Sequence, residues 1–267
     1  MIKRMLRHGF AVLGFELRRA SGWKGLTRTA RRIVRGSHGL ASFPPLRIEF
    51  FGASGAGKSF FGEELRRRRS FRDGWLADNE VLAAGLGTPE TDPALLEAYL
   101  DLFSRQYAIT LNSGLPVSGC LQMLSILARK LHGDLHLSLR NTQHWVLRNT
   151  GIFHNFSGAL LEQCESSSGH FRRIVDSRVG IHCTAPAELI ADRIALRATH
   201  GSITPQHDLL SRDELVNHTR GQLRAKALLA QALRTEGVPV LEIDLSADLR
   251  HSTEAVRSFL NELRQEV

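Results

Sequence analysis

A glycine-rich stretch near residue 55 carries the residue types that bind phosphate. Its letters, Gly52-Ala53-Ser54-Gly55-Ala56-Gly57-Lys58-Ser59, fit the pattern G-x-x-x-x-G-K-[ST] at every fixed position. Glycines let the backbone curl so that successive amide groups point at phosphate oxygens. Lys58 would reach the outer phosphates of a bound nucleotide, and the Ser59 hydroxyl would take one place on Mg²⁺. The stretch therefore predicts a site for a nucleoside triphosphate with magnesium.

The segments on either side supply the context that this pattern needs. "LRIEFFG" (46–52) is an apolar run typical of a buried strand, and a helix is expected from Lys58 to about Arg69. A helix that begins at Lys58 would also turn its positive end toward the bound phosphates. We therefore expect a strand, a phosphate-binding loop and a helix in direct succession.

Strands and helices alternate along the rest of the chain. The patterns predict further strands in residues 74–80, 144–153, 178–185 and 238–246. They predict helices in residues 91–114, 117–140 with a break near Gly133, 187–198, 211–235 and 252–263. This alternation predicts an α/β fold of three layers, with a five-stranded parallel sheet covered by helices on both faces.

The positive charge of the chain is concentrated at its beginning. Of the net charge of +8, residues 1–40 contribute +9, from ten Lys and Arg against one acid, so the remainder sums to −1. We therefore divide the chain into a basic amphipathic arm with its linker, residues 1–45, and a domain of residues 46–267. The arm suits an anionic membrane surface or an acidic partner, and it equally suits a helix that packs on the domain.

Several classes of protein are disfavoured by what the sequence lacks. No stretch has the roughly 18–20 apolar residues needed to span a bilayer. The three cysteines are widely spaced, which indicates a reducing compartment and no structural zinc site. The run of arginines in "EELRRRR" is paired with acids four residues earlier, so we do not expect nucleic-acid binding. The absence of N-K-x-D, and of a hydrophobic run ending in Asp-Glu, disfavours a GTPase and a motor ATPase.

With the loop at 52–59 and the segment "IHCTAPAELIADRIALRA", residues 46–265 resemble the P-loop small-molecule kinases, which include nucleoside monophosphate, shikimate and adenylylsulfate kinases. The resemblance implies the fold of a P-loop NTPase, with ATP and Mg²⁺ as cofactors. It also implies that Arg193 and Arg197, four residues apart on one helix, close over the transferring phosphoryl group. Residues of about 200–211 would then form a mobile lid.

The resemblance places an acid at the end of the second strand. Asp78, or as an alternative Glu80, would serve there as general base or magnesium ligand. At the end of the third strand, where many relatives carry an acid, this chain has Asn149, which cannot act as a base. His154, just beyond it, is a candidate contact for acceptor or phosphate, or a structural histidine.

The leading hypothesis is an enzyme, a kinase that moves the γ-phosphoryl of ATP to a hydroxyl of a small molecule. Lys58, Asp78, Arg193 and Arg197 would do the chemistry, and Ser59 with Asp78 would hold magnesium. A sugar or an envelope-glycan precursor is the acceptor suggested by "LGFELRRA", which resembles the starts of enzymes of bacterial surface-polysaccharide assembly. The expected location is cytoplasmic, at the inner face of the membrane if the arm binds lipid. The alternatives are a non-catalytic ATP-binding scaffold or regulator of an envelope assembly and, third, a sulfotransferase.

Overall fold

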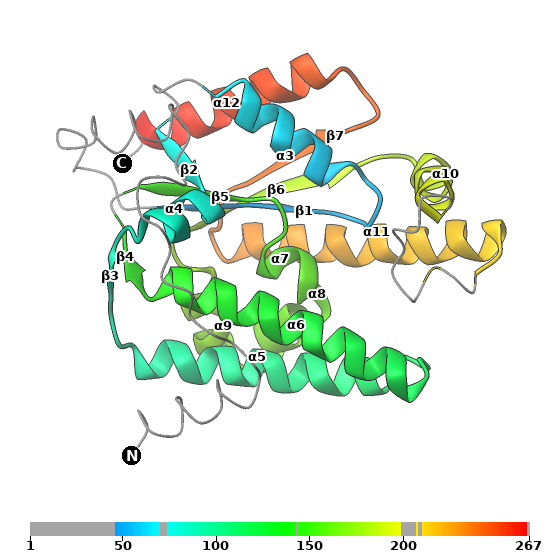
Figure 1. Ribbon diagram of the computed structural model, residues 1–267, viewed down its shortest axis with the longest axis horizontal. Coiled ribbons are helices and arrows are strands. Elements are labelled where there is room, and N and C mark those ends of the chain that lie inside the picture. Colours follow the sequence, from blue (N-terminus) through cyan, green and yellow to red (C-terminus); the bar gives the residue numbers. More distant parts are fainter. Residues whose placement is uncertain (1–45, 70–73, 143, 199–206, 208–209, 266–267) are drawn as a thin grey trace.

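A five-stranded parallel sheet forms the centre of the protein (Figure 1). The computed structural model describes residues 46–69, 74–142, 144–198, 207 and 210–265. The sheet has the order β2-β5-β1-β6-β7. Its strands are β1 (Arg47–Phe51), β2 (Trp75–Ala77), β5 (Trp145–Arg148), β6 (Arg178–Thr184) and β7 (Val240–Asp244). Each neighbouring pair runs parallel, and all five strands were predicted from the sequence.

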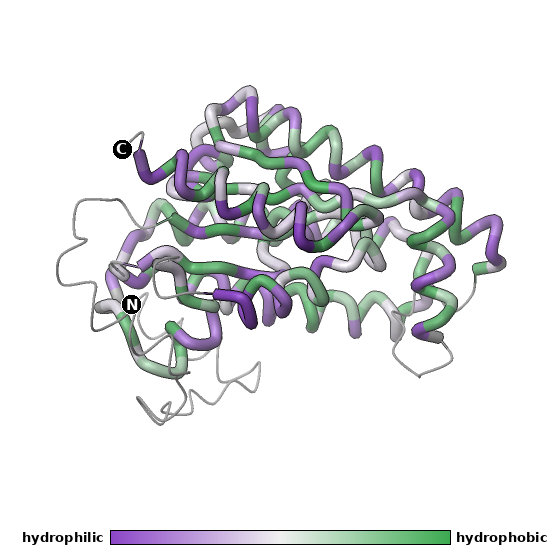
Figure 2. The backbone as a smooth tube through the Cα atoms, turned by 90° about the horizontal axis from the view of Figure 1, so that it is seen from above, coloured by the Kyte–Doolittle hydropathy of each residue, from purple (hydrophilic) through white to green (hydrophobic). Residues whose placement is uncertain are grey.

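The inner strands are buried on both faces, which is why their sequences are almost continuously apolar. Every residue of β5 is buried, and in β1 only Arg47 is not. Figure 2 shows the strands as largely hydrophobic tubes, with helices around them that alternate between hydrophilic and hydrophobic residues. Helices that alternate in this way turn one side to the sheet and the other to water.

Helices cover both faces of the sheet, as predicted (Figure 1). One face is covered by α3 (Lys58–Arg67) and α12 (Leu249–Gln265), which share a hydrophobic core with the strands. On the other face lie α5 (Pro93–Leu111), α6 (Val117–Ser138), α7 (Ile152–Asn155), α8 (Ser157–Ser166), α9 (Ser168–Val175) and α11 (Arg212–Thr235). Helix α10 (Ala187–Ala198) packs against α11 and the glycine-rich loop of residues 52–57. A short α4 (Asp78–Ala84) follows β2 directly.

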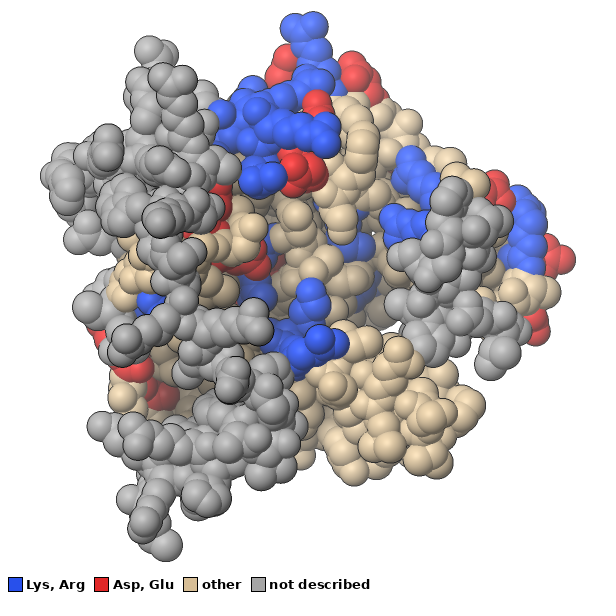
Figure 3. All heavy atoms as spheres, in the orientation of Figure 1, with Lys and Arg blue, Asp and Glu red and all other residues tan. Residues whose placement is uncertain are grey.

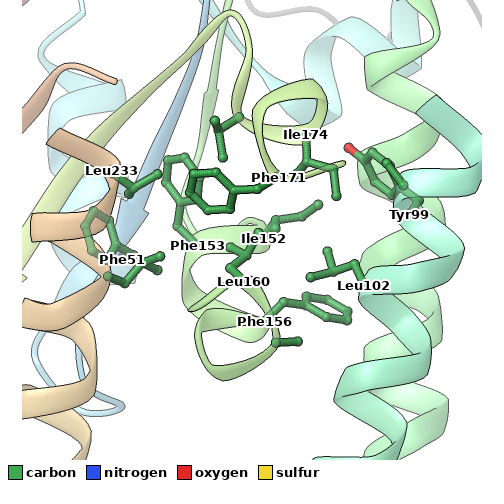
Figure 4. Packing of buried hydrophobic residues seen from close by; sticks show 14 of the residues in the cluster. Phe51, Tyr99, Leu102, Ile152, Phe153, Phe156, Leu160, Phe171, Ile174 and Leu233 are labelled. Atoms are coloured by element: carbon green, nitrogen blue, oxygen red, sulfur yellow. The ribbon is translucent and has the colours of Figure 1, made fainter. Parts of the chain in front are cut away.

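The short helix α7 lies within the larger hydrophobic core. Phe153 and Ile152 on α7, and Phe156 directly after it, are fully or almost fully buried. Figure 4 shows these side chains between Phe51 and Leu233 on one side and Tyr99 and Leu102 of α5 on the other. This packing fixes α7, and with it the backbone between β5 and α8, at the edge of the sheet where β1 ends.

Several features differ from the sequence-based expectations. The end of the strand expected over 74–80 is helical, because α4 begins at Asp78, and the short helices α7, α8 and α9 were not predicted. The break expected near Gly133 is wrong, because α6 continues without interruption to Ser138. Gly133 lies beneath the guanidinium group of Arg148, and the contacts of its neighbour Asp134 hold this part of the helix in place. The antiparallel pair β3 (Thr88–Pro89) and β4 (Arg140–Asn141) was also not expected.

The predicted arm, residues 1–45, lies outside the described residues, as does most of the predicted lid, of which only 207, 210 and 211 are described. Among the residues that are described, none of the helices combines the length and the apolar character that a membrane span requires.

The order in which the strands follow one another changes direction at β1. After β1, the next two strands of the sheet in chain order, β2 and β5, lie on one side of β1. The last two, β6 and β7, lie on its other side. In open parallel sheets, ligands bind outside the carboxyl ends of the strands where the direction of building changes. The glycine-rich loop of residues 52–57 lies at this point. The loop, the helix that follows it and the sheet confirm the predicted α/β fold of a P-loop NTPase.

Candidate phosphate-binding site

The loop between β1 and α3 needs glycine for both space and backbone conformation. Gly52 has a φ of 149° and lies so close to the Cys183 carbonyl that a β-carbon would overlap it. Gly55 has a φ of 87°, and a β-carbon there would meet Ile194 at 2.8 Å. Positive φ values of this kind are rare for residues with side chains. The loop conformation is therefore encoded by the glycines that the motif requires.

Helix α3 begins at Lys58, as predicted, with its first turn directly after the loop. Phe61 N donates to Gly57 O at 2.9 Å, and no acidic side chain lies in the first turn. The amide groups that precede this bond have no partner within the helix, and they carry the positive end of the helix dipole. Loop and helix terminus together suit an anion such as phosphate.

The side chain of Lys58 is buried against the loop. Its ammonium group donates to Gly52 O at 3.0 Å and to Ala53 O at 2.6 Å. Burial lowers the pKa of Lys58 to about 8, with a smaller lowering contribution from the charge of Arg197. The group remains mainly protonated at neutral pH, but it is held by carbonyls in place of water. Arg197 thus lies within electrostatic reach of Lys58.

Arg193 and Arg197, for which one shared role was predicted, have different surroundings. Arg193 donates to Ala56 O at 3.0 Å and to Leu245 O at 3.2 Å. It therefore ties the glycine-rich loop to the residue after β7. The Arg197 side chain is exposed, and its positive charge contributes to the lowered pKa of Lys58. Arg197 is the one of the two with a guanidinium group available to the site.

His154 contacts the same loop carbonyl as Lys58. Its Nδ1 lies 2.9 Å from Gly52 O, and because a carbonyl can only accept, Nδ1 carries the hydrogen and donates. Burial, reinforced by the charges of Lys58 and Lys226, holds the pKa of His154 well below its usual value. His154 is therefore a neutral donor to the loop.

Lys226 of α11 was not recognised from the sequence. Its ammonium group donates to His154 O and, at 2.7 Å, to Ser157 Oγ. Burial, together with the charge of Lys58, lowers the pKa of Lys226 to about 7. One signal could have pointed to it. Lys226 is the only charged residue in the apolar stretch "AKALLAQAL", residues 225–233.

A second contact from α11 reaches the loop one helical turn earlier. Gln222 Oε1 accepts from Ser54 N at 3.0 Å, and the same side chain lies 2.8 Å from His218 Nε2. Gln222 and Lys226 are four residues apart and so share one face of α11. This face of α11 supports the loop directly through Gln222 and indirectly through Lys226.

The predicted acid Asp78 lies at the first position of α4, directly after β2. Its Oδ2 accepts from Arg148 Nε at 3.3 Å, and its carboxylate remains partly exposed. Glu80, the alternative acid, is buried with Arg69, which donates to it at 2.6 Å. Glu80 therefore serves the packing of α4, and Asp78 is the acid that remains open to a ligand.

Arg148 connects Asp78 to a charge network beneath the sheet. Arg148 also pairs with Asp134, which is fully buried, and Asp134 pairs in turn with Arg178. Arg178 then pairs with Glu49 in the middle of β1. Buried charges are tolerated only when paired in this way. The network explains why the apolar strand β1 contains a glutamate.

Lys130 of α6 extends the set of cations around the site. Its ammonium group lies 3.4 Å from Thr150 Oγ1, and it lies within electrostatic reach of Asp78 and Arg148. Figure 3 shows Lys and Arg side chains gathered around the hollow between α6 and α10. An anionic ligand would therefore find positive groups on both sides of this hollow.

The oxygen atoms of Ser59 and Asp78 suit a magnesium ion that also binds phosphate oxygens of a ligand. No cluster of three or more His, Cys, Asp or Glu within the described ranges could hold a metal by itself. Mg²⁺ usually keeps several waters and takes one or two protein oxygens together with substrate phosphates. Ser59 in the first turn of α3 is exposed, and Asp78 is partly exposed, so both can offer such oxygens.

The chain matches no model of a protein family and no curated protein. The deoxyadenosine kinase from M. mycoides, solved with bound dATP, is 15% identical, with a TM-score of 0.42, and the match covers 81% of this chain and 99% of that one. A protein described as a "putative kinase" from Chloroflexus aurantiacus J-10-fl is 17% identical, with a TM-score of 0.34 and the same coverage. Likeness at this level carries no argument about function, and the fold rests on the strand order and the loop.

Proposed function

We propose that this protein is an ATP-dependent kinase that transfers the γ-phosphoryl group to a hydroxyl of a small molecule. One observation carries the proposal. The glycine loop and Lys58 lie at the carboxyl end of β1, and a partly exposed carboxylate, Asp78, lies at the same edge of the sheet after β2. A phosphate site and an acid at one edge are what phosphoryl transfer requires.

Each residue has a role in this proposal. The amides of residues 53–59 and Lys58 would hold the phosphates, and Ser59 with Asp78 would hold magnesium, which would offset the negative charge of the phosphates. Arg197 would stabilise the charge on the transferring group. Arg193 would hold the loop in position, because its guanidinium group donates hydrogen bonds to Ala56 O and Leu245 O.

The reaction follows from these positions. The oxygen of the acceptor hydroxyl forms a bond to the γ-phosphorus while the bond from that phosphorus to the β–γ bridging oxygen breaks. ADP leaves with the bridging oxygen, and the hydroxyl proton passes to the carboxylate of Asp78. The carboxylate of Asp78 is paired with Arg148 on one side and is partly exposed, so an acceptor can approach it.

We propose a sugar or an envelope-glycan precursor as the acceptor. A sugar or an envelope-glycan precursor rests on the likeness of "LGFELRRA" alone, and action at the inner face of the membrane rests on the basic residues 1–40. The cations around the hollow between α6 and α10 favour an acceptor that carries negative charge.

A non-catalytic nucleotide-binding protein is the second candidate, and one observation favours it. The residue after β5 is Asn149, and its neighbour Arg148 engages Asp78, so the acid is shared with an arginine. In that case ATP would bind without being turned over. A sulfotransferase, the third candidate, would prefer a 3′-phosphoadenylyl donor.

The test is incubation with γ-labelled ATP and Mg²⁺, with and without a small-molecule extract of the source cells, beside a Lys58→Met variant. Label in an extract-dependent product that the variant does not form would support the kinase. Binding of ATP without transfer would favour the second candidate. Transfer from a 3′-phosphoadenylyl donor would favour the third.

A further inference from the structure

The two carbonyl oxygens that bind the Lys58 ammonium group each have a second hydrogen-bond donor. Lys58 donates to Gly52 O and Ala53 O, at 3.0 Å and 2.6 Å. Gly52 O also accepts a hydrogen bond from His154 Nδ1 at 2.9 Å. Ala53 O also accepts one from the backbone amide of Ala56 at 3.3 Å. Each carbonyl therefore keeps one donor when Lys58 turns away.

Nucleotide binding makes this second donor important. To reach the phosphates, Lys58 must exchange its bonds to the two carbonyls for bonds to phosphate oxygens. A buried carbonyl left without a donor is costly, because it can no longer bond to water. Both Gly52 and Ala53 are buried. A second donor removes that cost from the binding of the nucleotide.

His154 is held in place from two directions. Directly before it, Phe153 N donates to the buried carboxylate of Glu49 at 3.1 Å. From α11, Lys226 donates to the carbonyl of His154 and to Ser157 Oγ. A side chain whose backbone is bound on both sides has little freedom to leave Gly52 O.

We propose that His154 is a positioning residue that keeps the Gly52 carbonyl hydrogen-bonded while Lys58 moves to the nucleotide phosphates, and that Lys226 holds His154 in this position. The inference rests on the proposed function only in that the loop binds a nucleotide. It holds for a nucleotide-binding protein without catalysis as well.

The first test compares two variants of nearly equal size. In His154→Asn the amide nitrogen takes the place of Nδ1 and can still donate, whereas His154→Leu removes the donor. We expect His154→Leu to bind Mg·ATP about tenfold more weakly, or ~1.4 kcal/mol, and His154→Asn to lie within a few-fold of the parent. The affinities are measured by calorimetric titration. His251→Leu, an exposed histidine of α12, is the matched control.

A double variant separates positioning from general damage. When Lys58 is replaced by Met there is no lysine to release, so His154→Leu should change the remaining affinity for Mg·ATP by less than about twofold. Thermal melting of each variant, without nucleotide, shows whether the protein is folded. If His154→Leu does not fold, His154→Phe, which keeps a ring without a donor, takes its place in the cycle.

Each outcome decides a different question. If the parent does not bind Mg·ATP, the proposed function fails and the inference fails with it. If the parent binds and Lys58→Met weakens binding, but His154→Leu binds as the parent does, the proposed function stands and the inference is wrong. A loss of equal size in His154→Leu and His154→Asn would also overturn it, because the hydrogen bond would then not be the cause.

Discussion

Asn149, the residue after β5, lies directly against Gly62 of α3. A β-carbon on Gly62 would overlap Oδ1 of Asn149, so the glycine provides the space that the amide occupies. Gly62 is buried and comes one helical turn after Lys58. Asn149 is therefore part of the packing between β5 and the helix that carries the phosphate site.

Gly62→Ala should destabilise the protein for this reason. The added methyl group forces Asn149 away from α3, and we expect a loss of about 1–3 kcal/mol in the free energy of unfolding, measured by urea denaturation. Gly221→Ala is the matched control, because a β-carbon on that helical glycine of α11 meets nothing within 4 Å. It should stabilise the protein by up to about 1 kcal/mol. Equal effects of the two changes would contradict the proposed contact.

Asp78→Asn should separate nucleotide binding from phosphoryl transfer. The amide cannot accept the hydroxyl proton, so transfer to the extract-dependent product should slow by about 10²–10⁴-fold. The affinity for Mg·ATP should fall by much less than the rate of transfer, because Lys58, Ser59 and the loop still hold the nucleotide and its magnesium. Glu254→Gln, an exposed acid on α12, serves as control. A full rate in Asp78→Asn would remove Asp78 from the mechanism.

The affinity for nucleotide should fall as the solution becomes alkaline. Burial lowers the pKa of Lys58 to about 8, so the lysine loses its proton above that pH while an unperturbed lysine would keep it. A bound phosphate stabilises the charged form, and binding therefore takes up a proton. Above pH 8 the affinity for Mg·ATP should weaken by up to about tenfold per pH unit.

Lys58→Met provides the comparison for this pH profile. It has no titrating group at this position, so its weaker affinity should be nearly constant between pH 7 and about 9.5. A parallel decline in both proteins would show that another group is responsible.

Breaking the buried ion pair of Glu49 with Arg178 should lower the free energy of unfolding more than breaking an exposed ion pair. Both side chains are fully buried, and Glu49→Gln leaves Arg178 without one of its two carboxylates. We expect a loss of about 3 kcal/mol in the free energy of unfolding. Asp192→Asn, which breaks an exposed pair with Arg212, should cost less than about 1 kcal/mol. Urea denaturation of both variants checks the comparison, and similar losses would speak against it.

The sequence predicted the elements of the fold well because their signals are local. The apolar runs at 46–52 and 178–185 have the length and flanking residues of buried strands, and both are strands in the structure. Asp92 caps α5 through Leu95 N at 2.9 Å, and Ser211 with Glu214 forms a capping box at the start of α11. Short helices such as α7 and α9 were missed because a few turns leave too little periodicity to recognise.

The conformation of the glycine-rich loop was determined by the sequence alone, because the motif lies in eight consecutive residues whose glycines fix the backbone. The tertiary structure decided which other side chains join it. Lys226 lies 72 residues from the His154 carbonyl that it binds, and Arg148 lies 70 residues from Asp78. It also decided that Arg193 supports the loop while Arg197 is exposed within electrostatic reach of Lys58. Such contacts depend on how parallel strands and their crossover helices are ordered in space, and no local pattern of residues encodes that order.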